Sequence, residues 1–300
     1  MRINTNMAAL NAWRSMTVNN SAMTKSLEKL SSGYRVNRAA DDAAGLAVSE
    51  KMRAQIRGLN MAIRNAQDGV SLVQTAEGGA QKIQDMLQRM RELAVQANSG
   101  TLQGSDKELL QKEFEQLQKE INRTAQTTKF NEIDLAQVFD EDGDPITAPG
   151  TTAKISIQVG PGATNQDKIE ITITDLRADI LGLTEVDNTD PGNPTTTFTS
   201  VMSLNISTGA ETAIKVIDAA LTTLSATRAD FGAIQNRLEA AIETLQIQSE
   251  NLTAAESRIR DVDMAQEMAT FTKYQILQQA STAMLAQANQ STQAILSLLR

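Results

Sequence analysis

Apolar residues recur at alternating steps of three and four positions along two long stretches of the chain, one in each half. This alternation is the period of a coiled-coil seam, the stripe along which one helix packs against another. The first stripe consists of Ile56, Leu59, Ile63, Ala66, Val70, Val73, Ala76, Ala80, Ile83, Leu87, Met90, Ala94 and Ala97. The second, which Arg228 and Gln248 interrupt, consists of Ile214, Ile217, Leu221, Leu224, Phe231, Ile234, Leu238, Ala241, Leu245, Leu252, Ala255, Ile259 and Val262. The sequence therefore predicts one long helix over residues 46–98 and another that ends near residue 262.

Each stripe contains one place where two steps of three follow each other. These places are Val70, Val73 and Ala76 in the first stripe, and Arg228, Phe231 and Ile234 in the second. Such a double step is a stammer, which overwinds a supercoil locally. Because both stripes carry one, we predict that the two long helices are partners in one bundle.

A third helix is predicted between the two seams. Ser105 and Glu108 have the spacing of a capping box, which marks the start of a helix. The apolar positions that follow are Leu110, Phe114, Leu117 and Ile121. We expect the chain to turn at residues 98–100 and the third helix to run back along the first.

The middle of the chain has a different period. All five prolines lie from Pro145 to Pro194, and because proline breaks helix interiors, the long helices are confined to the two ends. Apolar and polar residues alternate at 155–159 and at 169–173, on either side of a Gly-Pro-Gly turn, as in two half-buried strands. The predicted fold is mainly α: a long antiparallel coiled-coil helical bundle from both chain ends, with a small β-hairpin region in the middle.

The composition excludes several classes of function. The chain has no Cys and no His, which rules out thiolate nucleophiles, His-based acid–base pairs and most zinc sites. A net charge of -8 disfavours nucleic acid, which needs clustered Lys and Arg. No apolar stretch approaches the roughly 20 residues of a membrane-spanning helix. We expect a non-enzymatic protein with no cofactor, no metal, no nucleic-acid partner and no membrane anchor.

Two acidic clusters have structural explanations. Asp41 and Asp42 stand just before the first seam, where acids cap a helix N-terminus and complement its dipole. The acidic run at 140–144 imitates the start of a calcium loop, but Pro145 stands where such a loop requires Gly. We expect a helix cap and an acidic turn.

The two chain ends carry few large apolar side chains for their length. Residues 1–40 and 263–300 are rich in Ala, Ser, Thr, Asn and Gln. Burial of their few apolar side chains yields less free energy than the loss of conformational entropy on ordering these residues costs. We therefore predict that both ends are mobile in the free monomer and become ordered when copies of the same protein cover them.

Three parts of the sequence resemble bacterial flagellin. They are MRINTN at residues 1–6, LSSG at 30–33 with RAADDAAGL at 38–46, and AILSLLR at 294–300. Family-like sequence covers about residues 1–185 and 203–300. The resemblance implies a structural subunit that is secreted without a cleaved signal and polymerises into the extracellular flagellar filament, through coiled-coil packing of its N- and C-terminal helices, to serve motility.

The resemblance also implies domains and partners. Residues 1–45 and 263–300 would form an inner terminal domain, residues 46–186 and 203–262 a rod-like core domain, and residues 187–202 a short exposed variable loop in place of large outer domains. The implied partners are further copies of the chain, a flagellar export chaperone, the hook-associated junction proteins, the filament cap, and Toll-like receptor five of hosts. The alternative function is a hook–filament junction protein of the hook-associated type, which would form a finite assembly.

Two sets of site residues follow. The receptor-binding set for Toll-like receptor five, for which packing within the filament is the alternative role, is Gln88, Arg89, Leu93, Gln96 and Glu113. The polymerisation set is Ile3, Met7, Leu10, Leu27, Leu30, Ile276, Leu285, Ile295, Leu298 and Leu299. Some flagellins carry an inserted metalloprotease, but that site requires two His, which this chain lacks.

Overall fold

The computed structural model of the chain describes residues 6–137, 152–178, 181, 184–186 and 197–298. The chain forms two compact units, Met1–Arg57 with Gln248–Arg300, and Gly58–Ile247. The boundaries between the units lie within two long helices, α2 (Ala43–Ala97) and α4 (Ile206–Arg260). Parts of the predictions lie outside the described residues: the acidic run at 140–144 with Pro145, most of the loop at 187–202, Ile3 and Leu299.

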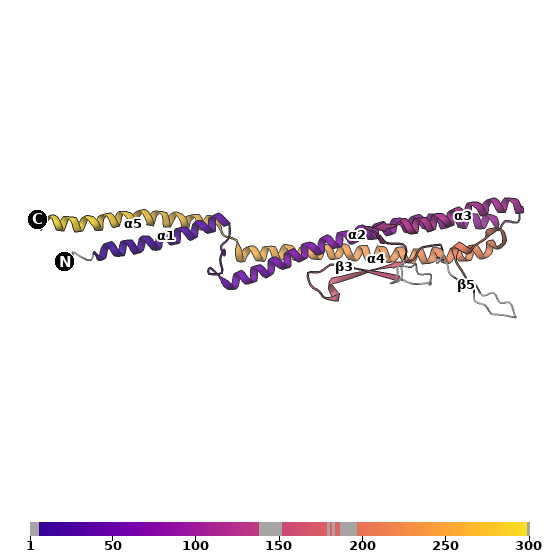
Figure 1. The fold of residues 1–300 in the computed structure, drawn as a ribbon, viewed down its shortest axis with the longest axis horizontal. Helices are drawn as coiled ribbons and strands as arrows, with labels where there is room; N and C mark the ends of the chain where they lie inside the picture. Colours follow the sequence, from indigo (N-terminus) through magenta and orange to yellow (C-terminus); the bar gives the residue numbers. More distant parts are fainter. Residues whose placement is uncertain (1–5, 138–151, 179–180, 182–183, 187–196, 299–300) are drawn as a thin grey trace. The chain divides into compact units, whose positions relative to one another are not determined.

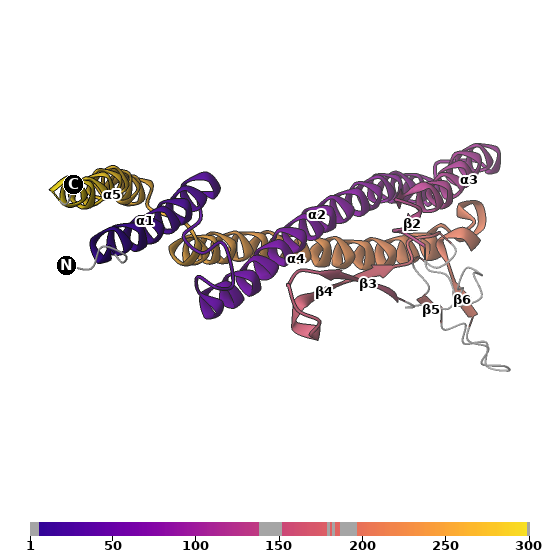
Figure 2. The same cartoon turned by 60° about the vertical axis from the view of Figure 1, so that its left-hand side comes forward.

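The unit of residues 58–247 is built around α2 and α4, which run antiparallel in Figure 1 and Figure 2. Two ion pairs and one close approach define the register of α2 and α4. Arg91 Nε donates to Asp218 Oδ1 at 2.6 Å, Arg228 Nη2 lies 3.4 Å from Glu77 Oε1, and a Cβ on Gly69 would lie 3.4 Å from Leu238 Cδ1.

This register brings the two stammers to the same level of the unit. Val73 and Ala76 of α2 share one buried cluster with Phe231 and Ile234 of α4. Both helices therefore shift the phase of their apolar stripes at one place, and neither stripe loses its partner. The prediction that the two long seams pack together is confirmed.

The third helix, α3 (Gly104–Thr127), packs on the same core through Phe114 and Ile121, both fully buried. Its predicted start is wrong. The N-cap is Gln103 and makes no side-chain capping bond, while Ser105 and Glu108 lie inside the helix. The carbonyl of Gln103 already accepts the backbone N–H groups of Asp106 and Lys107, both at 3.1 Å, so the first turn closes before the capping-box pattern begins.

The middle of the chain forms the predicted hairpin. Strands β3 (Thr152–Gln158) and β4 (Lys168–Thr174) pair antiparallel, with Ile155 opposite Ile171 and Ile157 opposite Ile169. Alternate residues of β4, including Ile171, are buried in the cluster shared by α2 and α4. The turn at 160–162 is held by the side chain of Gln158, which donates to Gly160 O at 2.9 Å and Gly162 O at 2.6 Å.

Shorter elements complete this unit. Two further antiparallel pairs join β1 (Lys129–Phe130) to β2 (Ile133–Asp134), and β5 (Thr184–Val186) to β6 (Thr197–Thr199). The 3-10 helices are η1 (Asn165–Asp167) and η2 (Val201–Ser203). Gln118 of α3 is buried and donates to Val201 O at 2.6 Å, which ties η2 to the core.

The other unit contains α1 (Met7–Ser32) and α5 (Met264–Leu298), which lie side by side and antiparallel (Figure 1). It also contains the first turns of α2 and the last turns of α4. Among the described residues, no helix is both long and apolar enough to cross a membrane.

Candidate assembly surface

The contact between α1 and α5 is a heptad seam that combines small and polar side chains with larger apolar ones. Its positions on α1 are Ala9, Ala12, Met16, Asn19, Met23, Ser26 and Leu30, and on α5 they are Glu267, Phe271, Tyr274, Gln278, Ser281, Leu285 and Ala288. Hydrogen bonds cross it: Asn19 Nδ2 donates to Ser281 Oγ at 3.1 Å, and Ser26 Oγ donates to Glu267 Oε1 at 2.5 Å. Of these side chains only Ser26 is fully buried, so the apolar side chains of this seam are buried only in part.

Ten further large apolar side chains among the described residues of these two helices lie off the seam and are exposed. They are Met7, Leu10, Trp13, Val18 and Leu27 on α1, and Met264, Met268, Ile276, Leu277 and Met284 on α5. Their exposed fractions run from 38 % at Leu277 to 64 % at Met284. Exposed apolar surface of this extent on two adjacent helices is typical of an interaction site.

The structure divides the predicted polymerisation residues into three groups. Met7, Leu10, Leu27 and Ile276 are exposed, and Leu30 and Leu285 are half-buried in the seam. Ile295 and Leu298 belong to α5, but their side chains, like Ile3 and Leu299, are outside the described residues. The sequence prediction did not name the other six exposed residues, Trp13, Val18, Met264, Met268, Leu277 and Met284, because the sequence shows that they are apolar but not which face of each helix is paired.

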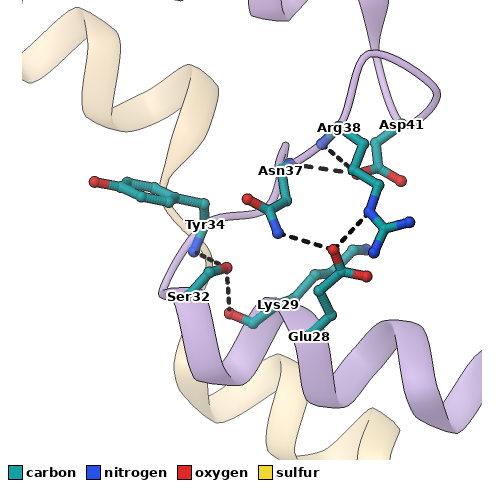
Figure 3. Close-up of polar contacts among 7 residues, drawn as sticks. All are labelled: Glu28, Lys29, Ser32, Tyr34, Asn37, Arg38 and Asp41. Carbon is teal, nitrogen blue, oxygen red and sulfur yellow. Dashed lines mark hydrogen bonds and ion pairs between the residues drawn. The ribbon is translucent and has the colours of Figure 1, made fainter.

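A compact turn joins α1 to α2 (Figure 3). Gly33 ends α1 with a φ of 75°, a left-handed conformation that favours glycine. Glu28 Oε1 then accepts from Asn37 Nδ2 at 2.9 Å and from Arg38 Nε at 2.7 Å. Asp41 closes the turn by accepting the backbone N–H of Arg38 at 3.0 Å, and this bond lowers the pKa of its carboxyl group.

The next residue starts the following helix. Asp42 Oδ1 accepts the backbone N–H of Gly45 at 2.8 Å, so the predicted cap of α2 is confirmed for Asp42. Asp41, its neighbour, holds the turn instead. The two acids, which look equivalent in the sequence, therefore have different structural roles.

Arg260, at the end of α4, connects three segments of this unit. Its guanidinium carbon lies 4.5 Å from the centre of the Tyr34 ring, and its Nη1 lies 2.7 Å from Glu50 Oε1 on α2. The hydrogen bond from Arg260 lowers the pKa of Glu50. The carbonyl of Arg260 accepts the N–H of Arg35 at 2.6 Å, and Tyr34 forms a β-bridge with Asp261. These contacts fix the chain between α1 and α2 against the end of α4.

The predicted receptor-binding residues lie in the other unit, on α2 and α3. Arg89 Nε donates to Glu113 Oε1 at 3.0 Å, and Arg89 Nη1 pairs with Glu92 at 3.0 Å; both acids raise the pKa of Arg89. Gln88, Arg89, Gln96 and Glu113 are all exposed. Leu93 is not: it is 1 % exposed and belongs to the core cluster of α2, α3 and α4.

This surface is slightly hollowed. Gln88 and Gln96 line a shallow depression of about 470 Å³ together with Arg91, Glu92 and Val95. Among the described residues, no group of acidic side chains is arranged to hold a metal ion.

Comparisons with known proteins agree with this architecture. Residues 3–139 match the family model for the bacterial flagellin N-terminal helical region, and residues 214–299 match that for the C-terminal helical region. A flagellin from Bacillus subtilis (strain 168) is 49 % identical over 309 residues, and the match covers 100 % of both chains. The chain belongs to the bacterial flagellin family.

Two further comparisons place this flagellin among its relatives. The flagellar filament 33 kDa core protein of Treponema phagedenis is 44 % identical over 302 residues and is also covered in full. A structure described as that of a flagellar hook-associated protein from Vibrio parahaemolyticus shares the fold alone, with 12 % identity, a TM-score of 0.54, and coverage of 74 % of this chain and 100 % of that chain.

Membership of the family settles the general role. Flagellins are structural proteins that form the extracellular filament of the bacterial flagellum, so this chain is a filament subunit, serves motility and polymerises with its own copies. Its relatives match over their full length at a similar size, so this is a short form of flagellin.

Proposed function

We propose that copies of this flagellin polymerise through the exposed apolar faces of α1 and α5. The observation that supports this is the exposure of large apolar side chains on these helices: the seam holds small, polar and only partly buried apolar residues, and ten further large apolar residues among the described residues lie exposed. Burial of one such side chain stabilises an interface by about 1.5–3 kcal/mol. Covering the faces with neighbouring copies therefore adds to the partial apolar burial in the seam.

Seeded elongation tests this proposal with matched substitutions. Monomer is mixed with filament fragments, and growth is followed by light scattering and electron microscopy. Ile276→Asn and Met7→Asn should slow or stop elongation, because each places a polar amide in an apolar contact. Ile276→Leu and Met7→Leu keep the apolar volume and should elongate like the unmodified chain. Removal of residues 1–30 or 271–300 should abolish growth.

Two results would contradict the proposal. Elongation of both Asn variants at the unmodified rate would show that these faces make no polymer contacts. Finite rings formed by the unmodified chain would instead support the junction protein of the hook-associated type. Circular dichroism of dilute monomer, in which we expect the helices of both ends to be largely lost, separately tests whether ordering of the ends depends on assembly.

The resemblance to flagellin implies further partners, and the exposed apolar surface supports one of them. Ten exposed apolar side chains on the unassembled chain need cover before assembly, which supports binding by a flagellar export chaperone. Hook-associated junction proteins and the filament cap are proposed as the partners at the two ends of the polymer. We propose that each subunit has two domains within the filament. The inner domain comprises residues 1–45 and 263–300, and the rod-like domain comprises residues 46–186 and 203–262.

We also propose that the surface of Gln88, Arg89, Gln96 and Glu113 binds Toll-like receptor five. The support is the resemblance together with an exposed array of polar side chains, in which Arg89 donates hydrogen bonds to Glu92 and Glu113. Arginine presented in this way is a typical interface anchor. Leu93 supports the surface from the core and makes no direct contact.

A binding measurement separates the two roles. Arg89→Ala should weaken binding to the receptor ectodomain by about tenfold or more, since an anchor residue contributes at least 1–2 kcal/mol. Its thermal unfolding should be nearly unchanged, because exposed ion pairs contribute little. Arg123→Ala, which removes another exposed ion pair from α3, is the control and should bind normally. Unchanged binding of Arg89→Ala would refute the assignment.

A further inference from the structure

Among the described residues of α1 and α5, four of the ten exposed large apolar side chains are methionines. The chain has no Cys, so methionine is its only sulfur-containing residue. We propose that Met7, Met264, Met268 and Met284 form an oxidation-sensitive modification site, and that their conversion to sulfoxides by peroxide prevents the subunit from joining the filament. This inference rests on the proposed assembly surface.

The positions of these side chains expose them to oxidants before assembly. Met7 and Met284 are 62 % and 64 % exposed, and Met264 and Met268 are both 49 % exposed, whereas Met90 in the core is fully buried. On α5, three of the methionines belong to one row of exposed positions spaced four apart, in which Met264 and Met268 neighbour each other and Met284 lies two steps beyond Ile276. The row is Met264, Met268, Thr272, Ile276, Ala280 and Met284.

The reaction is a two-electron oxidation by a peroxide. A lone pair of the methionine Sδ attacks the protonated oxygen of the peroxide, the O–O bond breaks, and the proton of the attacked oxygen passes to the departing oxygen, so that an S=O bond forms and water or an alcohol leaves. The sulfur is oxidised and the peroxide reduced, and the reaction needs no cofactor. It converts a flexible apolar side chain into a polar one.

This change acts on assembly through burial. A neighbouring copy that covers the row must bury the S=O group, and burial of an unpaired polar group opposes association. Each buried sulfoxide should therefore raise the critical concentration for elongation by about tenfold or more. Assembled subunits, whose methionines are covered by neighbours, should be oxidised more slowly than monomers.

The experiment treats purified monomer with hydrogen peroxide, locates sulfoxides by peptide mass spectrometry, and measures seeded elongation. Oxidised monomer should elongate poorly, while a chain with Met7, Met264, Met268 and Met284 all changed to Leu should elongate equally with and without peroxide. The control changes the two exposed methionines of the other unit, Met61→Leu and Met202→Leu, and should stay peroxide-sensitive.

A competition needs no variant. Partly oxidised monomer is elongated on seeds, and the filament should be depleted in sulfoxide at the four positions relative to the supernatant. Equal sulfoxide content in both fractions, or normal elongation of monomer oxidised at all four positions, would overturn the inference and leave the assembly surface intact. Failure of untreated monomer to elongate would instead count against the assembly surface itself.

Discussion

Two adjacent glycines in the middle of α2 face very different surroundings, and this difference yields a quantitative prediction. A Cβ added to Gly78 would meet nothing within 4 Å. A Cβ added to Gly79 would lie 2.7 Å from both Thr128 Cγ2 and Thr128 Oγ1, and 3.2 Å from Thr128 Cβ. Gly79 therefore lies where the C-cap residue of α3, Thr128, closely approaches the backbone of α2.

Alanine at either position gains the same helix propensity, about 0.5–1 kcal/mol. At Gly79 the new methyl group also overlaps a β-branched side chain that cannot rotate away, because both branches of Thr128 are close and its Oγ1 donates to Thr124 O at 2.7 Å. Such overpacking costs about 1–3 kcal/mol. We expect Gly78→Ala to stabilise the chain, and Gly79→Ala to be less stable than Gly78→Ala by that cost.

Urea unfolding followed by circular dichroism measures both variants, with equal slopes showing that the same surface is exposed on unfolding. The double variant Gly79→Ala/Thr128→Ala, compared with Thr128→Ala alone, should recover most of the difference, because the second substitution removes both of the closest overlapping atoms. Gly78→Ala and Gly79→Ala with equal stability would refute the packing of α3 on α2 at this point.

Three further substitutions test other contacts. Phe114→Ala should lower the free energy of unfolding by about 3–5 kcal/mol, whereas Leu109→Ala, at a position 64 % exposed, should change it by less than about 0.5 kcal/mol in the same urea titration. Because the bond from Arg260 lowers the folded-state pKa of Glu50 below its ordinary value of 4.5, ionised Glu50 stabilises the fold above about that pH, and the stabilisation is lost as the pH falls through the lowered pKa. Glu50→Gln should therefore show a smaller loss of filament melting temperature between pH 7 and pH 3 than the unmodified chain. Asp42→Ala should destabilise the first turn of α2 by about 1 kcal/mol, seen as faster amide hydrogen exchange in this turn in the filament. Asp42→Asn should keep most of this stability, because Asn also caps helices.

Much of the helical unit could be predicted because its pattern repeats. The stripes through Val73 and Phe231 predicted both helices and their pairing, and the alternation around Ile155 and Ile171 predicted the hairpin, whose register the structure shows. Patterns of this kind reflect burial, which acts on every turn of a helix and every second residue of a strand. Single local motifs were less reliable: the spacing of Ser105 and Glu108 fitted a capping box, but backbone bonds to Gln103 start the helix earlier.

Leu93 shows a second limit of the sequence. It lies beside the stripe rather than on it, and was expected at the surface, yet it is buried because α3 and α4 both pack on this part of α2. A helix with two neighbours buries a wider face than a two-stranded seam does. The width of the buried face depends on where α3 packs on α2. The spacing of apolar residues in α2 alone does not show that position.

The two chain ends show most clearly which features the sequence determined and which ones the tertiary structure decided. The sequence determined that they form helices, that they lack prolines, and which of their side chains are apolar. Only the tertiary structure decided that Asn19, Ser26 and Ser281 occupy the contact between α1 and α5 while Trp13 and Ile276 remain outside it. The physical reason is that helix periodicity selects a face by its position around the axis, and the identity of the partner decides which face that is.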